Sequence, residues 1–210
     1  PGALLRDADA AMYRAKERGR NRAEIFDDEL RALAVARLDL EHALAESVDR
    51  GDFGLVYQPE YELRGGRVIG AEALLRWRHP SRGEVAPTDF IGIAEETGAI
   101  TALGDWVFER ACRQAMTYLG GGPSGAGGVD PAELDPSFTV WVNVSVVQLL
   151  QPDFPGRIER VLLETGVDPT RMGLEITESA LMTDSDAAVA ALHALKALGL
   201  GIAIDDFGTG

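Results

Sequence analysis

Apolar side chains in the first 50 residues recur at the spacing of amphipathic helices. Between residues 4 and 18 they occupy every third or fourth position, which predicts one helix that Gly19 ends. A second stripe predicts a helix from about Asp27 to Val48, ended by Gly51, with its apolar positions at Leu33, Leu40, Leu44 and Val48. We interpret this second helix as a connector between two domains.

Beyond residue 50 the apolar pattern alternates between that of strands and that of helices. β-Branched and aromatic residues predict strands over residues 53–59, 68–77, 138–144, 172–177 and 201–204. Helical spacing predicts a short helix opened by Pro87, a longer one over residues 104–119, further turns up to Thr165, and a helix over 184–198. Strands that alternate with helices are typical of βα units, so we predict an α/β fold with a largely parallel sheet.

The pattern also predicts one loop, the inward face of one helix and the packing role of several single residues. The Gly-, Pro- and Asp-rich segment 120–137 predicts a flexible surface loop. In the helix over 184–198 we expect Val189, Leu192 and Leu195 to face inward. We interpret the single cysteine, Cys112, and the three tryptophans, among them Trp141, as packing residues.

Composition and charge narrow the class of protein. The chain has 210 residues with 46% hydrophobic and 26% charged side chains, which is ordinary for a globular protein. Its 20 basic and 34 acidic residues give a net charge of −14, which argues against a nucleic acid polymer as partner. One cysteine cannot form an internal disulfide, so we expect a reducing, cytoplasmic environment. No apolar run approaches the roughly 20 residues that span a bilayer.

Four of the predicted strands end in oxygen-bearing side chains. Glu72, Asn143 and Glu175 each follow an apolar run, and Asp205-Asp206 follows the last one. A carboxylate at the end of an apolar strand must pair, bind metal or shift its pKa, because burial of a bare charge is costly. Any one of these acids alone could be a strand-end cap. Together they predict a hard oxygen site suited to Mg²⁺, Mn²⁺ or Ca²⁺.

The motifs at these strand ends resemble those of one known family. The chain carries Glu72-Ala73-Leu74 with Leu75-Arg76-Trp77, and further matches at 57–59, 89–98, 143–145, 175–179 and 205–210. These motifs resemble the signature of EAL domains, which are cyclic di-GMP phosphodiesterases. The segment from Ala8 to Arg22 resembles the closing helix of a GGDEF, or diguanylate cyclase, domain.

The resemblance implies a fold, a domain organisation and a reaction. It implies a TIM-like βα barrel of EAL type, truncated after about the fifth strand and preceded by an N-terminal helical segment. Residues 1–25 are expected to be a GGDEF remnant, 26–50 a connecting helix with the start of the EAL domain, and 51–210 the EAL domain. The implied reaction is hydrolysis of cyclic di-GMP to linear pGpG with Mg²⁺ or Mn²⁺.

The resemblance also implies roles for eight residues. The expected metal ligands are Glu72, Asn143, Glu175, Asp205 and Asp206, and the expected catalytic residues are Glu72, Asp205 and Asp206. The expected substrate contacts are Gln58, Leu74 and Arg76. An arginine suits phosphate because its guanidinium donates two parallel hydrogen bonds.

Two departures from the family pattern leave alternatives open. Gly92 stands where the family usually has Pro, and the family's later catalytic Lys, Glu and Gln are absent. The chain starts at Pro1 without Met and ends at Gly210, so we interpret it as a piece of a longer protein, whose missing regions could include a membrane anchor. We expect the piece alone to be inactive. The alternative to an enzyme is a receptor that binds cyclic di-GMP without cutting it. A homodimer is possible, although the pattern shows no dimer face.

Overall fold

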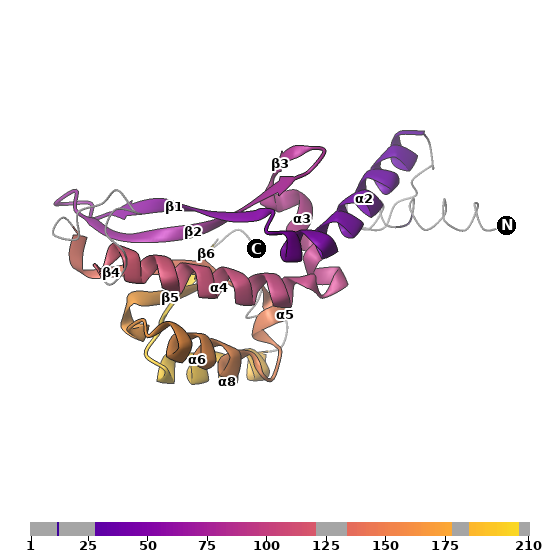
Figure 1. Ribbon diagram of the computed structural model, residues 1–210. Helices are drawn as coiled ribbons and strands as arrows, with labels where there is room; N and C mark the ends of the chain where they lie inside the picture. Colours follow the sequence, from indigo (N-terminus) through magenta and orange to yellow (C-terminus); the bar gives the residue numbers. More distant parts are fainter. Residues whose placement is uncertain (1–11, 13–27, 121–133, 178–184, 206–210) are drawn as a thin grey trace. The chain divides into compact units, whose positions relative to one another are not determined.

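The computed structural model describes Met12 and residues 28–120, 134–177 and 185–205 (Figure 1). The chain divides into two compact units, Pro1–Glu46 and Ser47–Gly210. Helix α2 (Asp28–Arg50) confirms the predicted second helix, and it is followed by Gly51 with φ at 78°. Leu40 and Leu44 on this helix are buried, as its stripe predicts. The predicted helix over residues 4–18 and the expected GGDEF remnant lie outside the described residues, apart from Met12.

The second unit alternates strands and helices as the sequence predicts. Its strands are β1 (Phe53–Tyr61), β2 (Val68–His79), β3 (Gly83–Val85), β4 (Leu134–Asn143), β5 (Met172–Thr177) and β6 (Gly201–Asp205). Its helices are α3 (Pro87–Thr97), α4 (Ala99–Tyr118), α5 (Val146–Leu149), α6 (Phe154–Thr165), the 3₁₀ turn η2 (Pro169–Arg171) and α8 (Ser185–Ala197).

Three differences from the prediction are larger than two residues at the end of an element. Strand β3 was not expected, because three residues are too short to show an alternating pattern. Strand β4 begins at Leu134, so residues 134–137 belong to a strand and not to the predicted loop, the rest of which lies mostly outside the described residues. Helix α4 begins at Ala99, five residues before the predicted start, directly after Gly98 in the left-handed conformation that ends α3.

The described strands form one mixed sheet. Their order is β1-β2-β4-β5-β6, and β3 pairs with β2. Strands β1 and β3 run antiparallel to β2, whereas the pairs β2–β4, β4–β5 and β5–β6 are parallel. The α/β class is confirmed, with an antiparallel hairpin at one edge. Within the described residues the sheet stays open, with β1 and β6 at the two ends of the strand order.

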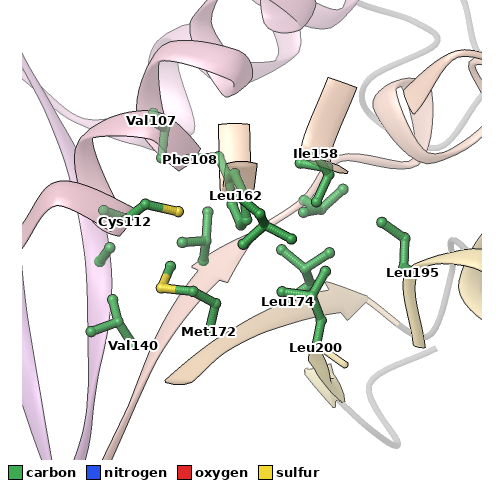
Figure 2. Close-up of a cluster of buried hydrophobic side chains, with 14 of the residues drawn as sticks. Val107, Phe108, Cys112, Val140, Ile158, Leu162, Met172, Leu174, Leu195 and Leu200 are labelled. Atoms are coloured by element: carbon green, nitrogen blue, oxygen red, sulfur yellow. The ribbon is translucent and has the colours of Figure 1, made fainter. Parts of the chain in front are cut away.

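The hydrophobic core lies between the sheet and helices α4, α6 and α8 (Figures 1 and 2). Alternate strand residues such as Val140, Met172 and Leu174 point into it and are fully buried. Burial of each such side chain contributes about 1.5–3 kcal/mol. Cys112 is also fully buried there, as expected. The inward position expected for Val189 is wrong, because that side chain is 46% exposed.

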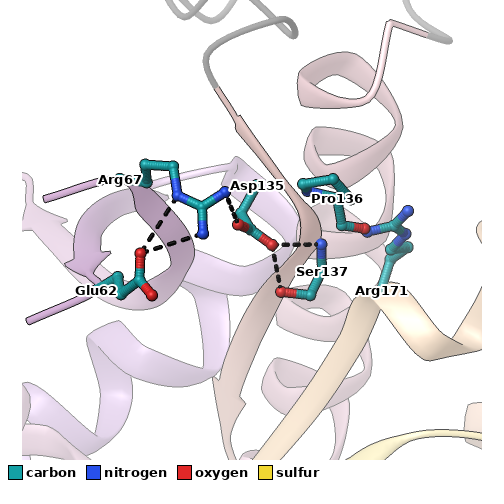
Figure 3. Close-up of polar contacts among 6 residues, drawn as sticks. All are labelled: Glu62, Arg67, Asp135, Pro136, Ser137 and Arg171. Carbon is teal, nitrogen blue, oxygen red and sulfur yellow. Dashed lines mark hydrogen bonds and ion pairs between the residues drawn. The ribbon is translucent and has the colours of Figure 1, made fainter. Parts of the chain in front are cut away.

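A polar cluster fastens the beginning of β4 to its neighbours (Figure 3). Arg67, in the turn between β1 and β2, forms ion pairs with Glu62 at 3.1 Å and with Asp135 at 2.9 Å. Asp135 accepts hydrogen bonds from the backbone N and the Oγ of Ser137 at 2.9 and 2.6 Å, which lower its pKa. Arg171 donates to the carbonyl oxygen of Pro136. These contacts hold the amino ends of β2, β4 and β5 together, away from the strand ends that carry the acids.

Across the described ranges, no helix combines the length and the apolar character that crossing a membrane requires.

Candidate active site

The side chains predicted at strand ends lie on the sheet face opposite the core. The predicted strand end at Glu72 is wrong, because β2 continues to His79 through its pairing with β1 and β3. On each parallel strand the residues that alternate with the buried positions point away from the helices. This places Glu72, Asn143, Glu175 and Asp205 on one face of four consecutive strands, β2, β4, β5 and β6. Asn143 pairs directly with Glu175, and Asp205 with Thr177. The sheet therefore brings together residues that are up to 133 positions apart, from 72 to 205.

A hydrogen bond and a pKa shift show that the side chains of this row, Glu72, Asn143, Glu175 and Asp205, lie close together. Asn143 Nδ2 donates a hydrogen bond to Glu72 Oε1 at 2.6 Å. Glu175, which is half-buried, has its pKa raised to about 7, first by burial and then by the negative charges of Glu72, Asp205 and Glu60. The charges of Glu72, Asp205 and Glu60 thus lie near enough to Glu175 on β5 to disfavour its ionised form.

The row fits a hard cation by its chemistry. Its donors are carboxylate and amide oxygens, and a bound cation would offset both the burial of Glu175 and the negative charges around it, which together raise the pKa of that carboxyl. Within the described ranges, however, no three Asp, Glu, His or Cys side chains gather into a ready-made metal site. Asp206, the remaining expected ligand, lies outside the described residues. The five expected ligands therefore stay a prediction.

The three expected substrate contacts lie on the same face, on the hairpin next to the row. Gln58 pairs across from Glu72, and Leu74 pairs across from Val56. Arg76 lies two residues further along β2, where its Nε is 3.5 Å from Glu84 Oε1 and its Nη1 donates to the Leu75 carbonyl at 2.9 Å. The guanidinium of Arg76 is thus already held by a carboxylate from β3, a strand that was not predicted.

Glu60 and Trp141, for which no role in the site was expected, lie beside the row. An added Cβ at Gly173 would be 2.2 Å from Trp141 Cε3, and one at Gly201 would be 3.1 Å from Trp141 Cη2, so the indole lies against both glycines. Burial and the charge of Glu72 raise the pKa of Glu60, and a hydrogen bond from Trp141 opposes them. Trp141 is a packing residue as expected, but on the site face. Its position two residues before Asn143 on a strand was the available signal.

A second set of residues without an expected role surrounds the turn after Asn143. Ser145 caps α5, and its Oγ also donates to Glu95 Oε1 in α3 at 2.5 Å. Both residues stand within motifs that match the family, yet neither motif indicated that the two would meet, because they are 50 positions apart.

The chain is similar to known proteins over nearly its whole length. The sequence pattern of the EAL domain matches residues 41–210. MucR of Pseudomonas aeruginosa, a bifunctional diguanylate cyclase/cyclic di-GMP phosphodiesterase, is 40% identical over 207 residues, which are 99% of this chain and 28% of MucR. The cyclic di-GMP phosphodiesterase NbdA of the same organism is 36% identical over 208 residues, 99% of this chain and 25% of NbdA. The chain thus spans between 25% and 28% of the length of these two relatives.

The fold is also that of solved EAL structures. The PaMucR phosphodiesterase in its c-di-GMP complex superposes with a TM-score of 0.72 and 39% identity, covering 82% of this chain and 65% of that one. This likeness confirms the expected EAL-type α/β fold. Since the EAL pattern matches most of the residues and the structure follows the same fold, the chain belongs to the EAL domain family.

Proposed function

We propose that the protein hydrolyses cyclic di-GMP to linear pGpG and that the reaction depends on Mg²⁺ or Mn²⁺. The observation that carries the proposal is the row of Glu72, Asn143, Glu175 and Asp205 on four consecutive strands. The names of MucR and NbdA as cyclic di-GMP phosphodiesterases support the substrate, and so does the c-di-GMP complex of PaMucR.

We assign the cation to the oxygen donors of Glu72, Asn143, Glu175, Asp205 and Asp206. When bound, such a cation supplies Lewis-acid polarisation of a phosphoryl oxygen. Glu72, Asp205 and Asp206 are the proposed catalytic residues, because their carboxylates would orient the attacking water. Burial and the neighbouring charges raise the pKa of Glu175 to about 7, so this carboxyl is only partly ionised near neutral pH when no cation is present.

We assign the substrate to the hairpin beside the row. Arg76 would bind a phosphate through its guanidinium, in competition with Glu84. Gln58 and Leu74 would contact the rest of the dinucleotide, because both lie on the same face as Glu72.

We also propose the domain organisation expected from the sequence. Residues 1–25 would be the end of a GGDEF domain, followed by a connecting helix over 26–50 and the EAL domain from 51 onward. The name of MucR as a bifunctional diguanylate cyclase supports this order, since MucR aligns with 99% of the chain. The single buried cysteine, Cys112, and a nucleotide substrate favour a cytoplasmic location.

The experiment is a product assay with a matched variant. Purified full-length protein, since the piece alone is expected to be inactive, is incubated with cyclic di-GMP and Mg²⁺ or Mn²⁺, and pGpG is separated by chromatography. Glu72→Gln, which keeps the shape of the side chain, should abolish the product, whereas Glu159→Gln on the exposed side of α6 should not. If the unmutated protein binds cyclic di-GMP but forms no pGpG, the proposed hydrolysis would be wrong and the protein would be a cyclic di-GMP receptor.

A further inference from the structure

The turn that leaves β4 directly after Asn143 is fixed by several hydrogen bonds. Val144 N donates to the Glu175 carbonyl at 2.9 Å, which continues the pairing of Asn143 with Glu175. Ser145 then closes a capping box: its Oγ accepts from Val147 N at 3.1 Å, and its own N donates to Gln148 Oε1 at 3.3 Å. Asn143 is therefore only two residues away from Ser145, the capped N-terminus of helix α5.

Helices α3 and α4 hold this capping box from outside. Ser145 Oγ donates to Glu95 Oε1 at 2.5 Å. Gln148 is 4% exposed and lies against Gly104 of α4, where an added Cβ would be 1.8 Å from Gln148 Nε2. Gln151 Nε2 donates to Thr101 Oγ1 at 2.7 Å. The turn is consequently fixed to elements that lie elsewhere in the sequence.

Glu95 is the charged member of these contacts. A hydrogen bond to a carboxylate is stronger than one between neutral groups, so Glu95 restrains Ser145 more than a neutral acceptor would. The restraint reaches the row because Asn143, two residues before Ser145, donates to Glu72 at 2.6 Å. Movement of Ser145 would therefore displace the amide of Asn143 from Glu72.

We propose that Glu95 is a positioning residue of the active site, which acts through Ser145 to set the place of the Asn143 amide against Glu72. The inference deepens the proposed function, because Asn143 is one of the residues to which we assign the cation. A carboxylate that only stabilised helix α5 would contribute to folding but would leave the Asn143 side chain unaffected.

The first test needs neither cation nor substrate. Hydrogen exchange of the Asn143 side-chain amide is followed by NMR in the parent protein and in Glu95→Ala, Glu95→Asp and Glu95→Gln. We expect exchange to be about tenfold faster in Glu95→Ala and in Glu95→Asp, whose shorter side chain draws the carboxylate away from Ser145. Glu95→Gln keeps an oxygen acceptor for Ser145 but loses the charge, so its exchange should lie between that of the parent and that of Glu95→Ala. Glu95→Asp keeps the charge, so the test stands if Glu95→Ala does not fold.

The second test measures Mn²⁺ affinity by calorimetric titration of the same variants. We expect about tenfold weaker binding in Glu95→Ala, the effect typical of a residue that orients a metal ligand. Asp168→Ala is the matched control. Asp168 also accepts a hydroxyl hydrogen bond, from Thr170 Oγ1 at 2.7 Å, but it does so just before η2, at the amino end of β5. This control should leave both the Asn143 exchange and the Mn²⁺ affinity unchanged.

The outcomes separate this inference from the proposed function. Unchanged Asn143 exchange in Glu95→Ala would overturn the positioning role, and so would unchanged Mn²⁺ affinity in that variant when the parent binds Mn²⁺. If Asn143 exchange is faster in Glu95→Ala but the parent binds no Mn²⁺, the result would support the role of Glu95 and overturn the cation assignment instead.

Discussion

Asn143 Nδ2 donates to Glu72 Oε1 at 2.6 Å and thereby joins the carboxyl end of β4 to the middle of β2, 71 positions apart in the sequence. Each of these side chains is the other's partner on the face opposite the core. A change at Glu72 therefore acts twice, because it removes a carboxylate from the row and leaves the Asn143 amide without its acceptor.

Divalent cations should stabilise the protein against heat through this row. A ligand that binds only the folded state at 100 times its Kd adds about 2.7 kcal/mol to the free energy of unfolding. For a unit of this size Mn²⁺ should raise the Tm by about 5–10 °C. Glu72→Ala should abolish the increase, whereas Glu159→Gln on the exposed side of α6 should keep it. Thermal denaturation with EDTA and with Mn²⁺ measures both, and an undiminished increase in Glu72→Ala would show that these side chains do not form one site.

Arg76 should contribute to cyclic di-GMP binding without affecting the cation. Arg76→Ala removes the guanidinium proposed to bind a phosphate, so the binding free energy should weaken by about 2–3 kcal/mol. Glu84→Gln removes the carboxylate 3.5 Å from Arg76 Nε and should leave binding unchanged or tighten it by about twofold, because that ion pair is exposed and weak. Calorimetric titration with each ligand tests both changes. Full dinucleotide affinity in Arg76→Ala would exclude Arg76 from the site.

The sequence predicted the elements of the fold because the apolar pattern of each is strong. Strand β5 was predicted with its observed bounds, since Met172, Leu174 and Ile176 alternate with residues of the other face. The inward position of Val189 was wrong because helical spacing alone did not decide which side of α8 meets the core. Its neighbour Ala188, a small residue, is buried in its place. Strand β3 depends on pairing with β2 and has no pattern of its own.

The row could be predicted because parallel strands align the carboxyl ends of β4, β5 and β6, and Glu72 joins the row from the middle of β2. The position of each residue in the row follows from alternation along its strand. Contacts across the sheet could not be predicted in the same way. Trp141 meets Gly173 and Gly201, and Glu95 meets Ser145, only because distant segments pack together, and no local pattern encodes that packing.

Glu175 should make the cation-free protein less stable as the pH rises. Its pKa is about 7 in the folded protein against an ordinary value of 4.5, so the folded state binds the proton more tightly. The resulting stabilisation is fully present below pH 4.5 and is lost as the pH rises to about 7. Glu175 is half-buried, so solvent screening reduces the effect to about 1 kcal/mol.

Glu175→Gln should remove this pH dependence. In EDTA, the variant should gain about 1 kcal/mol over the parent at pH 8 and almost nothing at pH 4.5. Urea denaturation at the two pH values measures the difference, with Glu159→Gln as the exposed control. A gain of equal size at both pH values would mean that the charge of Glu175 is not its cause.

Gly173→Ala should destabilise the protein because Trp141 occupies the space that a side chain would need. The added Cβ would lie 2.2 Å from Trp141 Cε3, and the indole is held by Gly201 on the next strand and by its hydrogen bond to Glu60. Overpacking of this kind costs about 1–3 kcal/mol. Gly54→Ala on β1 is the matched control, since an added Cβ there meets nothing within 4 Å. Urea denaturation should show a lower midpoint for Gly173→Ala alone, and equal midpoints for the two variants would mean that the indole can move away from β5 without loss.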